Sequence, residues 1–283
     1  MPFFLTVLFS ALLQMGSARG ADTSNKDSVP SAKDLQKTTL YREAQQHFRR
    51  KNYAEAARIF GQFLEKEKKD RSPFVRERVF WSIDLIVRIH LRVRKNPDAA
   101  LDFLKHVRKG LSLNEAQEDS IDEWVSVAKQ WKKMGKLPAN IKTKKELFAL
   151  GEKFYRRGMS KISYPSDDTG NADFYIAATY LVPFVYNFEG SENIGKALFM
   201  LGNIRFRSWT DYEYWTENFY LKEVIRRFPH SSLAKRAYKS LEESLRAGYT
   251  GSSGENIPPS QLKMLEVYKK LSQPSKPPKP LVF

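Results

Sequence analysis

Apolar residues recur every three or four positions along most of the chain, which is the period of an amphipathic α-helix. The clearest case is the stretch from Tyr41 to Pro73. Its first helical segment runs from about Thr38 to Arg50, a polar turn follows at Lys51 and Asn52, and the second segment begins near Tyr53. The apolar stripes of the two segments can close on each other, so this stretch predicts one helical hairpin.

Small side chains fall where the two helices of this hairpin would approach most closely. Ala44 holds that position in the first helix and Ala56 in the second, and the rings of Tyr53 and Phe60 flank Ala56 by about one turn on either side. A small residue between bulky ones lets two helices pack closely. We therefore expect these four residues to hold the hairpin together.

The hairpin resembles a tetratricopeptide repeat (TPR), a stacked helical hairpin of about 34 residues. The matching residues are Ala44, Tyr53, Ala56, Phe60 and Leu64. Leu40 stands at the usual tryptophan and Lys68 at the usual terminal proline. The resemblance implies a scaffold of stacked helices that binds other proteins.

Two weaker copies of the hairpin follow. The second joins a long helix, from Phe74 to Val93, to a helix that starts at Pro97 and carries Ala100 and Leu104. The separation of Ala56 and Ala100 along the chain is longer than the family's repeat of about 34 residues, so the array of repeats is expected to be irregular. The third copy comprises Ala197, Leu201, Gly202, Tyr220, Val224, Phe228 and Pro229.

The segment from Phe219 to Tyr238 carries a more specific resemblance. A helix ending in Arg-Phe-Pro-His-Ser is followed by Leu-Ala-Lys-Arg-Ala-Tyr, which resembles bacterial envelope repeat proteins of outer-membrane assembly and of Tol-Pal coordination. Pro229 should end the first helix and Ser231 or Ser232 should cap the next. The buried stripe of that next helix is expected to comprise Ala234, Ala237, Tyr238 and Leu241.

The fold class predicted from these patterns is all-α, an irregular TPR-like helical-hairpin solenoid. No alternation typical of strands is evident. We expect an N-terminal group of repeats in residues 38–136 and a C-terminal group in residues 140–272, divided near Pro138. Further helices are expected over residues 115–133, 144–157, 172–186, 193–207 and 260–271.

The beginning of the chain is typical of an exported protein. An apolar run with the length of a signal-peptide core is followed by small residues, and cleavage after Ala18 or Gly20 fits them, although no Lys or Arg precedes the run. Residues 1–20 are interpreted as a signal peptide, with an uncleaved membrane anchor as the alternative, and residues 21–37 as a disordered linker. The expected location is the periplasm or outer-membrane periphery of a Gram-negative bacterium.

Composition narrows the possibilities further. The 283 residues include no cysteine, which excludes disulfides, thiolate metal sites, covalent haem and lipidation on cysteine. No later apolar run approaches the roughly 18 residues of a membrane span, so the processed chain is not expected to be an integral membrane protein. Residues 273–283 are rich in proline and lysine and are expected to form a disordered tail.

The formal net charge of +16 implies anionic partners. Basic residues are spread along helical faces without a nucleic-acid-binding motif, so nucleic acid is not expected. Acidic envelope proteins, anionic lipid head groups and cell-wall polymers remain candidates, as does the alternative that these cations only keep the protein soluble. One cluster that could hold anions comprises Arg88, Arg92, Arg94 and Lys95.

Aromatic residues are concentrated in the connection between two helices of the third repeat. They could anchor a partner or wedge the connection into the protein's own core, and both interpretations stay open. The candidate partner-binding residues are Trp209, Tyr212, Tyr214 and Trp215, followed by Phe219 and Tyr220.

No catalytic or metal-binding motif is evident, and no cofactor is expected. The acidic turn of Asp167, Asp168, Asn171 and Asp173 lacks the EF-hand order, and its alternative role is to cap the next helix. His47, His90, His106 and His230 are far apart and are interpreted as packing residues. Glu152, Glu189 and Glu213 would be available to a wall-cleaving enzyme, but none lies in a catalytic motif. A non-catalytic scaffold is the favoured interpretation.

Overall fold

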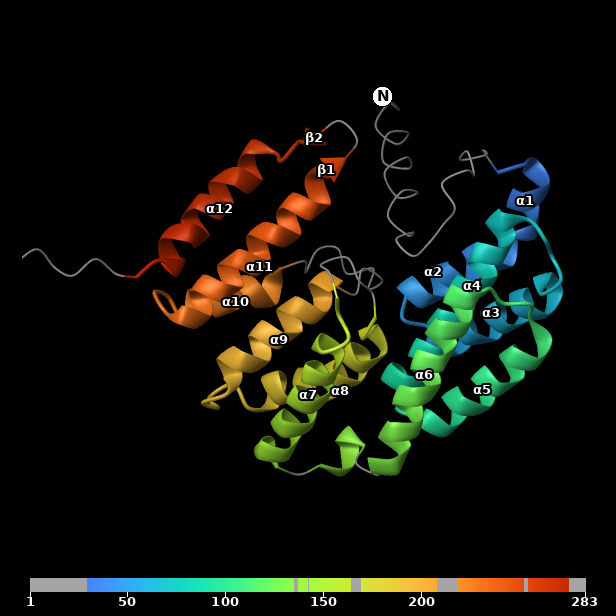
Figure 1. Ribbon diagram of the computed structural model, residues 1–283, viewed down its shortest axis with the longest axis horizontal. Helices are drawn as coiled ribbons and strands as arrows, with labels where there is room; N and C mark the ends of the chain where they lie inside the picture. The colour runs from blue at the N-terminus through green and yellow to red at the C-terminus, as the bar shows by residue number, and fades with distance from the viewer. Residues whose placement is uncertain are drawn as a thin grey trace, which may run out of the picture. The chain divides into compact units, whose positions relative to one another are not determined.

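The computed structural model describes residues 30–134, 137–141, 143–163, 169–207, 218–251 and 254–274. These residues form an all-α fold, as the sequence predicted (Figure 1). The β structure within them is a two-residue antiparallel ladder between β1 (Thr250–Gly251) and β2 (Gly254–Glu255), which the sequence pattern did not predict. None of the described helices is both long enough and apolar enough to cross a membrane.

The chain divides into two compact units. Unit 1 comprises residues 1–134 together with the short segment 162–169, and unit 2 comprises residues 135–161 and 170–283. The main division therefore follows Met134, close to Pro138, where the sequence suggested a boundary.

Unit 1 is built from helices that follow one another in antiparallel pairs. Its elements are α1 (Ala32–Lys37), α2 (Thr39–Arg49), α3 (Tyr53–Glu67), α4 (Pro73–Arg88), the π-helical segment η1 (Ile89–Val93), α5 (Pro97–Gly110) and α6 (Glu115–Met134). Helix α2 packs on α3, α3 on α4, and α5 on α6. The structure confirms the helices expected near residues 38–50, 74–93 and 115–133, and the helix expected to begin near Tyr53.

Helix α1 corrects part of the expectation that residues 21–37 are a disordered linker. Ser31 caps this helix, because its hydroxyl accepts a hydrogen bond from the backbone N–H of Asp34 at 3.1 Å, and the Asp34 carboxylate accepts one from the backbone N–H of Ser31. Lys37 forms an ion pair with Asp70 at the end of α3. This local cap and the contact with Asp70 together order a polar stretch that has no apolar stripe. Residues 1–29 lie outside the described part of the chain.

The α2–α3 hairpin packs around the residues that the sequence singled out. Ala44, Ala56 and Phe60 are completely buried. Tyr41 packs between the rings of the same core, with its centroid 5.8 Å from that of Phe60. Tyr53 is only half-buried and packs edge-on against Phe48 at 5.3 Å, so it closes the open end of the hairpin rather than its centre.

The same turn recurs between α4 and α5. Lys51 and Lys95 both adopt a left-handed backbone conformation, with φ of 62° and 51°, and each is followed by an asparagine that precedes a helix. The backbone N–H of Asn52 donates to the carbonyl of His47, and that of Asn96 donates to His90, each at 2.9 Å. The hydrogen bond from Asn96 to His90 spans one residue more than the bond from Asn52 to His47. Since a π-helix accommodates an extra residue in each turn, the segment η1 explains how the α4–α5 turn keeps the same hydrogen bond despite the extra residue.

The described part of unit 2 contains the 3-10 helical segment η2 (Pro138–Asn140) and six α-helices. The α-helices are α7 (Lys144–Met159), α8 (Asn171–Asn187), α9 (Ile194–Arg207), α10 (Phe219–Arg227), α11 (Ser232–Tyr249) and α12 (Pro259–Ser272). Residues 172–181 of α8 are buried on every side, so α8 is the central helix of the unit. It continues past Pro183, which lies inside the helix.

Glycine permits close helix approach at three places in unit 2. A Cβ atom at Gly151 would lie 2.6 Å from the Leu181 side chain, and one at Gly202 would lie 2.5 Å from Leu221. At Gly158 the neighbour would be the ring of Phe174, at 2.6 Å. Gly202 is one of the residues expected to pack the third repeat, and Leu201 beside it is also buried.

The Phe-Pro-His-Ser turn between α10 and α11 is tied to the end of α12. Ser231 rather than Ser232 caps α11, because its hydroxyl accepts a hydrogen bond from the N–H of Ala234 at 3.0 Å. His230 donates through its backbone N–H to Leu271 O at 2.7 Å and through Nδ1 to Gln273 O at 2.6 Å. Pro229 is exposed. The other repeat-packing residues expected here are buried, namely Tyr220, Ala234 and Ala237.

Replacing Gly202 tests the close approach of α9 and α10. Gly202→Ala is expected to lower the free energy of unfolding by about 1–3 kcal/mol, because the added methyl group would overlap Leu221. Gly248→Ala is the matched control, since a Cβ there meets nothing within 4 Å. That change should be neutral or stabilising, by up to about 1 kcal/mol. Urea unfolding followed by circular dichroism measures both, and equal effects would contradict the close approach.

Candidate functional site

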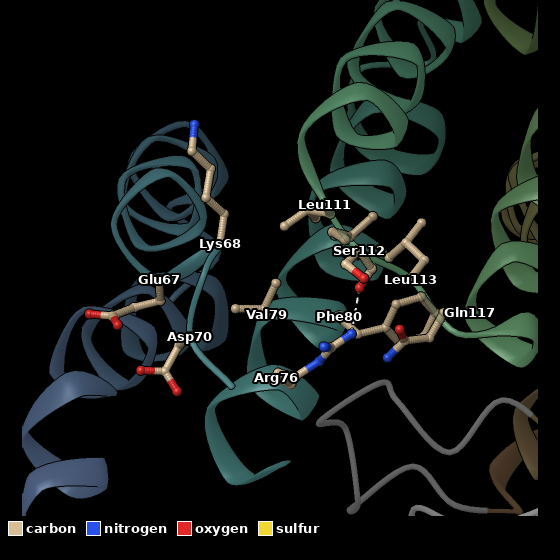
Figure 2. Close-up of a pocket in the computed structure, with 11 residues that line it drawn as sticks. Glu67, Lys68, Asp70, Arg76, Val79, Phe80, Leu111, Ser112, Leu113 and Gln117 are labelled. Atoms are coloured by element: carbon tan, nitrogen blue, oxygen red, sulfur yellow. Dashed lines mark hydrogen bonds between the residues drawn. The ribbon is translucent and has the colours of Figure 1, made fainter. Parts of the chain in front are cut away.

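A small cleft lies at one end of unit 1, between the α3–α4 corner and the loop that joins α5 to α6 (Figure 2). It contains about 280 Å³ of empty space that opens to solvent. The apolar residues that line it are Val79, Phe80, Ile83, Leu111 and Leu113. Its polar rim comprises Glu67, Lys68, Asp70, Arg76, Ser112 and Gln117.

Hydrogen bonds fix the α3–α4 side of the cleft. Asp70 accepts a hydrogen bond from the backbone N–H of Ser72 at 2.7 Å and forms an ion pair with Lys37 of α1. Burial would raise the pKa of the Asp70 carboxyl, but the contacts with Lys37 and the Ser72 N–H outweigh burial and hold this pKa below its ordinary value. Asp70 is therefore ionised at neutral pH and anchors the corner.

The α5–α6 loop, on the other side of the cleft, is bonded to α4. The Arg76 guanidinium donates a hydrogen bond to the carbonyl of Ser112, which Figure 2 shows as a dashed line. A reciprocal cap at the start of α6 orders the loop further: Asn114 Oδ1 accepts from the N–H of Gln117 at 2.9 Å, and Gln117 Oε1 accepts from the N–H of Asn114 at 3.2 Å. Leu111 and Leu113 are thus presented from an ordered loop.

The charges on the rim are largely satisfied, whereas the floor is apolar. Lys68 forms an ion pair with Glu65 at 2.6 Å, and Figure 2 shows its ammonium directed away from the cleft. The carboxylates of Glu67 and Asp70 are directed away from Leu111 in the same view. The arrangement combines a shallow apolar floor with polar groups at the rim. This cleft could not be predicted from the sequence, because its two sides come from turns about 40 residues apart in the chain.

The aromatic residues expected to bind a partner, Trp209, Tyr212, Tyr214 and Trp215, lie outside the described residues. Their described neighbours Phe219 and Tyr220 have T-shaped rings with centroids 5.4 Å apart. Phe219 is 48% exposed, whereas Tyr220 is buried. Of these two neighbouring residues, Phe219 therefore lies at the surface and Tyr220 in the core.

The acidic turn places its described aspartate in the core of unit 2. Asp173 is fully buried and forms ion pairs with Arg157, at 3.1 Å, and Lys161, at 2.6 Å. Burial raises the pKa of Asp173, and the two cations counteract this effect. Asp173 therefore joins α7 to α8 as an ion-pair partner. Asp167 and Asp168 lie outside the described residues. Among the residues that the structure describes, no three or more His, Asp or Glu side chains are grouped closely enough to hold a metal ion.

The glutamates considered for an enzyme form ion pairs on the surface. Glu152 accepts from Arg156 at 2.7 Å, and Glu189 lies 2.8 Å from Arg227. Glu213 lies outside the described residues. Neither described glutamate lines the cleft of unit 1.

The four histidines have separate surroundings, and His106 and His230 are exposed, which corrects their interpretation as packing residues. His47 contacts Asn52 at 3.2 Å, His106 lies 3.5 Å from Glu65, and His230 binds the end of α12. His90 packs against Phe103 with a centroid distance of 6.1 Å, and its buried Nδ1 makes no hydrogen bond. Burial lowers the pKa of His90, and Arg94 lowers it further.

The described members of the basic cluster Arg88, Arg92, Arg94 and Lys95 do not form a single anion site. Arg88 is buried and forms an ion pair with Asp84 one turn earlier in α4. Arg94 is exposed and Lys95 is half-exposed, both in the α4–α5 turn. Arg88 therefore belongs to the core, and the exposed cations belong to the turn.

No protein-family model matches the chain, and comparisons with curated proteins and with solved structures found no match.

Acidification should destabilise the protein through His90. Its folded-state pKa lies below the ordinary value of 6.5, so the unfolded chain takes up a proton first and stability falls as the pH drops below about 6.5. His90→Phe removes this contribution and should reduce the difference between urea midpoints at pH 7.5 and pH 5.5. Because Nδ1 makes no hydrogen bond, a phenyl ring should be tolerated at this position. His106→Gln, at an exposed histidine, is the control, and an unchanged pH difference in His90→Phe would refute the assignment.

Proposed function

We propose that this protein is a non-catalytic, TPR-like scaffold that binds another protein in the bacterial envelope. The observation that carries the proposal is the repeated turn of unit 1: Lys51-Asn52 and Lys95-Asn96 have the same backbone conformation, and Ala56 and Ala100 follow at the same spacing and are both fully buried. Repeated helical hairpins of this kind present ordered surfaces for recognition.

The cleft between the α3–α4 corner and the α5–α6 loop is the proposed contact site. An apolar side chain of the partner inserts against Val79 and Leu111, and its flanking backbone bonds to the polar rim near Gln117. An anchor of this type supplies much of the energy of an interface because it is removed from water on all sides. The Arg76–Ser112 contact keeps both walls in place before the partner arrives, which reduces the entropic cost of binding.

The proposal also includes export of the protein. It rests on the apolar run and small residues within residues 1–20 and on the resemblance of the Phe219–Tyr238 segment to envelope repeat proteins. The geometry of the Phe-Pro-His-Ser turn, with Ser231 as the cap, supports the helical pattern on which that resemblance depends. Envelope partners follow from this location.

Site-specific photo-crosslinking tests the cleft as the contact site. A photoreactive amino acid replaces Leu113, which lines the cleft, or, as a control, Leu262 on the exposed surface of α12. We expect irradiation of the native envelope to attach one protein at position 113 that is not attached at position 262, and that survives a high-salt wash. Mass spectrometry identifies the adduct. The same set of proteins at both positions would contradict binding in the cleft.

Analysis of the N-terminus tests export. When the full chain is expressed in a Gram-negative bacterium, the protein released by osmotic shock should begin at Arg19 or Ala21. Leu8→Arg interrupts the apolar run and should leave the chain unprocessed in the cytoplasm. Mass spectrometry of the N-terminal peptide measures both results. A full-length chain that stays in the cytoplasm without this change would overturn the localisation.

A further inference from the structure

Successive turns of unit 1 lie at opposite ends of its helices, because consecutive helices are antiparallel. Lys132 near the end of α6 lies 2.5 Å from Asp98 in the first turn of α5, and η1 packs against α3. One end of the unit therefore gathers the α2–α3 turn, the α4–α5 turn with η1, and the last turns of α6. We call this the basic end of unit 1.

The basic end has many cations and few carboxylates among the described residues. Its cations are Arg49, Arg50, Lys51, Arg92, Arg94, Lys95, Lys129, Lys132 and Lys133. All are exposed except Arg92 and Lys95, which are half-exposed. The nearby carboxylates are Glu55, which binds Arg58, and Asp98 and Asp102, which both act on Lys132. By formal charge, the cations at this end therefore outnumber the carboxylates near them.

The opposite end of unit 1, which we call the balanced end, carries cations and carboxylates in more nearly equal numbers. There Lys68 pairs with Glu65, Lys37 pairs with Asp70, and Arg108 lies beside both Glu118 and Asp122. Helices end at both ends of the unit, so the preference for cations at helix C-termini applies to both. This preference does not explain why the surplus of cations is larger at one end.

The basic end also carries an exposed apolar side chain. Val93 is 42% exposed at the end of η1, between Arg92 and Arg94. Neighbouring helices pack about 8–10 Å apart, so the ends of α2 to α6 offer a broad face rather than a single groove. A broad cationic face with an aliphatic residue among its charges suits the boundary between lipid head groups and acyl chains.

We propose that the basic end of unit 1 binds the anionic head groups of a lipid bilayer, with Val93 entering the head-group region. The cations attract phosphate groups over the whole face, and Val93 adds burial of apolar surface. Binding of this kind is peripheral and weakens with salt. It is independent of the cleft, which lies at the opposite end of the same helices.

Vesicle sedimentation with two charge-reversal variants tests the proposal. The first variant combines Arg50→Glu, Arg94→Glu, Lys129→Glu and Lys133→Glu. The second changes four exposed cations of the balanced end by the same total charge: Lys69→Glu, Arg71→Glu, Lys105→Glu and Lys109→Glu. All chains are full length, so the N-terminal apolar run contributes equally to each. Circular dichroism melts check that each variant is folded.

The wild-type chain should bind vesicles that contain phosphatidylglycerol more tightly than pure phosphatidylcholine vesicles, and added salt should remove the difference. The basic-end variant should lose at least about tenfold in partitioning onto the anionic vesicles, and the balanced-end variant should stay within about threefold of wild type. Equal losses in both variants would show that net charge alone is responsible. Tight binding of soluble polyglutamate without binding to vesicles would identify an acidic protein as the partner instead.

A fluorescent probe tests the role of Val93. Because the chain has no cysteine, Val93→Cys can be labelled at one position with an environment-sensitive dye. Emission should shift to the blue and rise when anionic vesicles are added. A label at Leu262→Cys, on a helix of unit 2, should not respond. A response at position 262 alone, or at neither position, would overturn the proposed orientation.

Discussion

Close approach of helices at residues with little or no side chain is the interaction on which this fold depends. In unit 1 the α2–α3 hairpin closes where Ala44 and Ala56 are completely buried beside Phe60. In unit 2 the same role falls to Gly151 and Gly202, whose Cα atoms face Leu181 and Leu221. A chain without cysteine has no disulfides to supplement this packing, so its stability depends on how well small and bulky side chains fit together.

Antiparallel packing then decides which polar groups meet. Every second turn of unit 1 lies at the same end of the helices, and residues far apart in the sequence become neighbours there. At one end, Arg76 reaches the Ser112 carbonyl and closes the wall of the cleft. At the other end, the turns at Lys51 and Lys95 bring cations from separate hairpins together. The cleft and the basic end are therefore both consequences of one packing pattern.

The helices and their buried stripes could be predicted from the sequence because they depend on local periodicity. Helix α1 could not be, since its contact with Asp70 comes from another helix and its own residues form no apolar stripe. The segment η1 was also missed: a π-helix has no periodicity of its own that can be recognised over five residues. The cleft escaped prediction for a further reason. Its apolar residues look like ordinary core positions until the α5–α6 loop is placed against the α3–α4 corner.

Net charge alone does not say where on this protein the positive charge lies. The value of +16 describes the whole chain and would be the same if every cation were evenly distributed. Folding separates the charges of unit 1 into a balanced end, where Arg108 lies between Glu118 and Asp122, and an end where carboxylates are scarce. Packing can also remove a cation from the surface. Arg88 is buried beside Asp84 and so does not belong to the basic surface cluster that its neighbours in the sequence suggested. A local surplus of charge attracts an anionic surface within the Debye length, whereas balanced charges cancel over that distance. Orientation toward an anionic partner therefore depends on which turns the packing brings together.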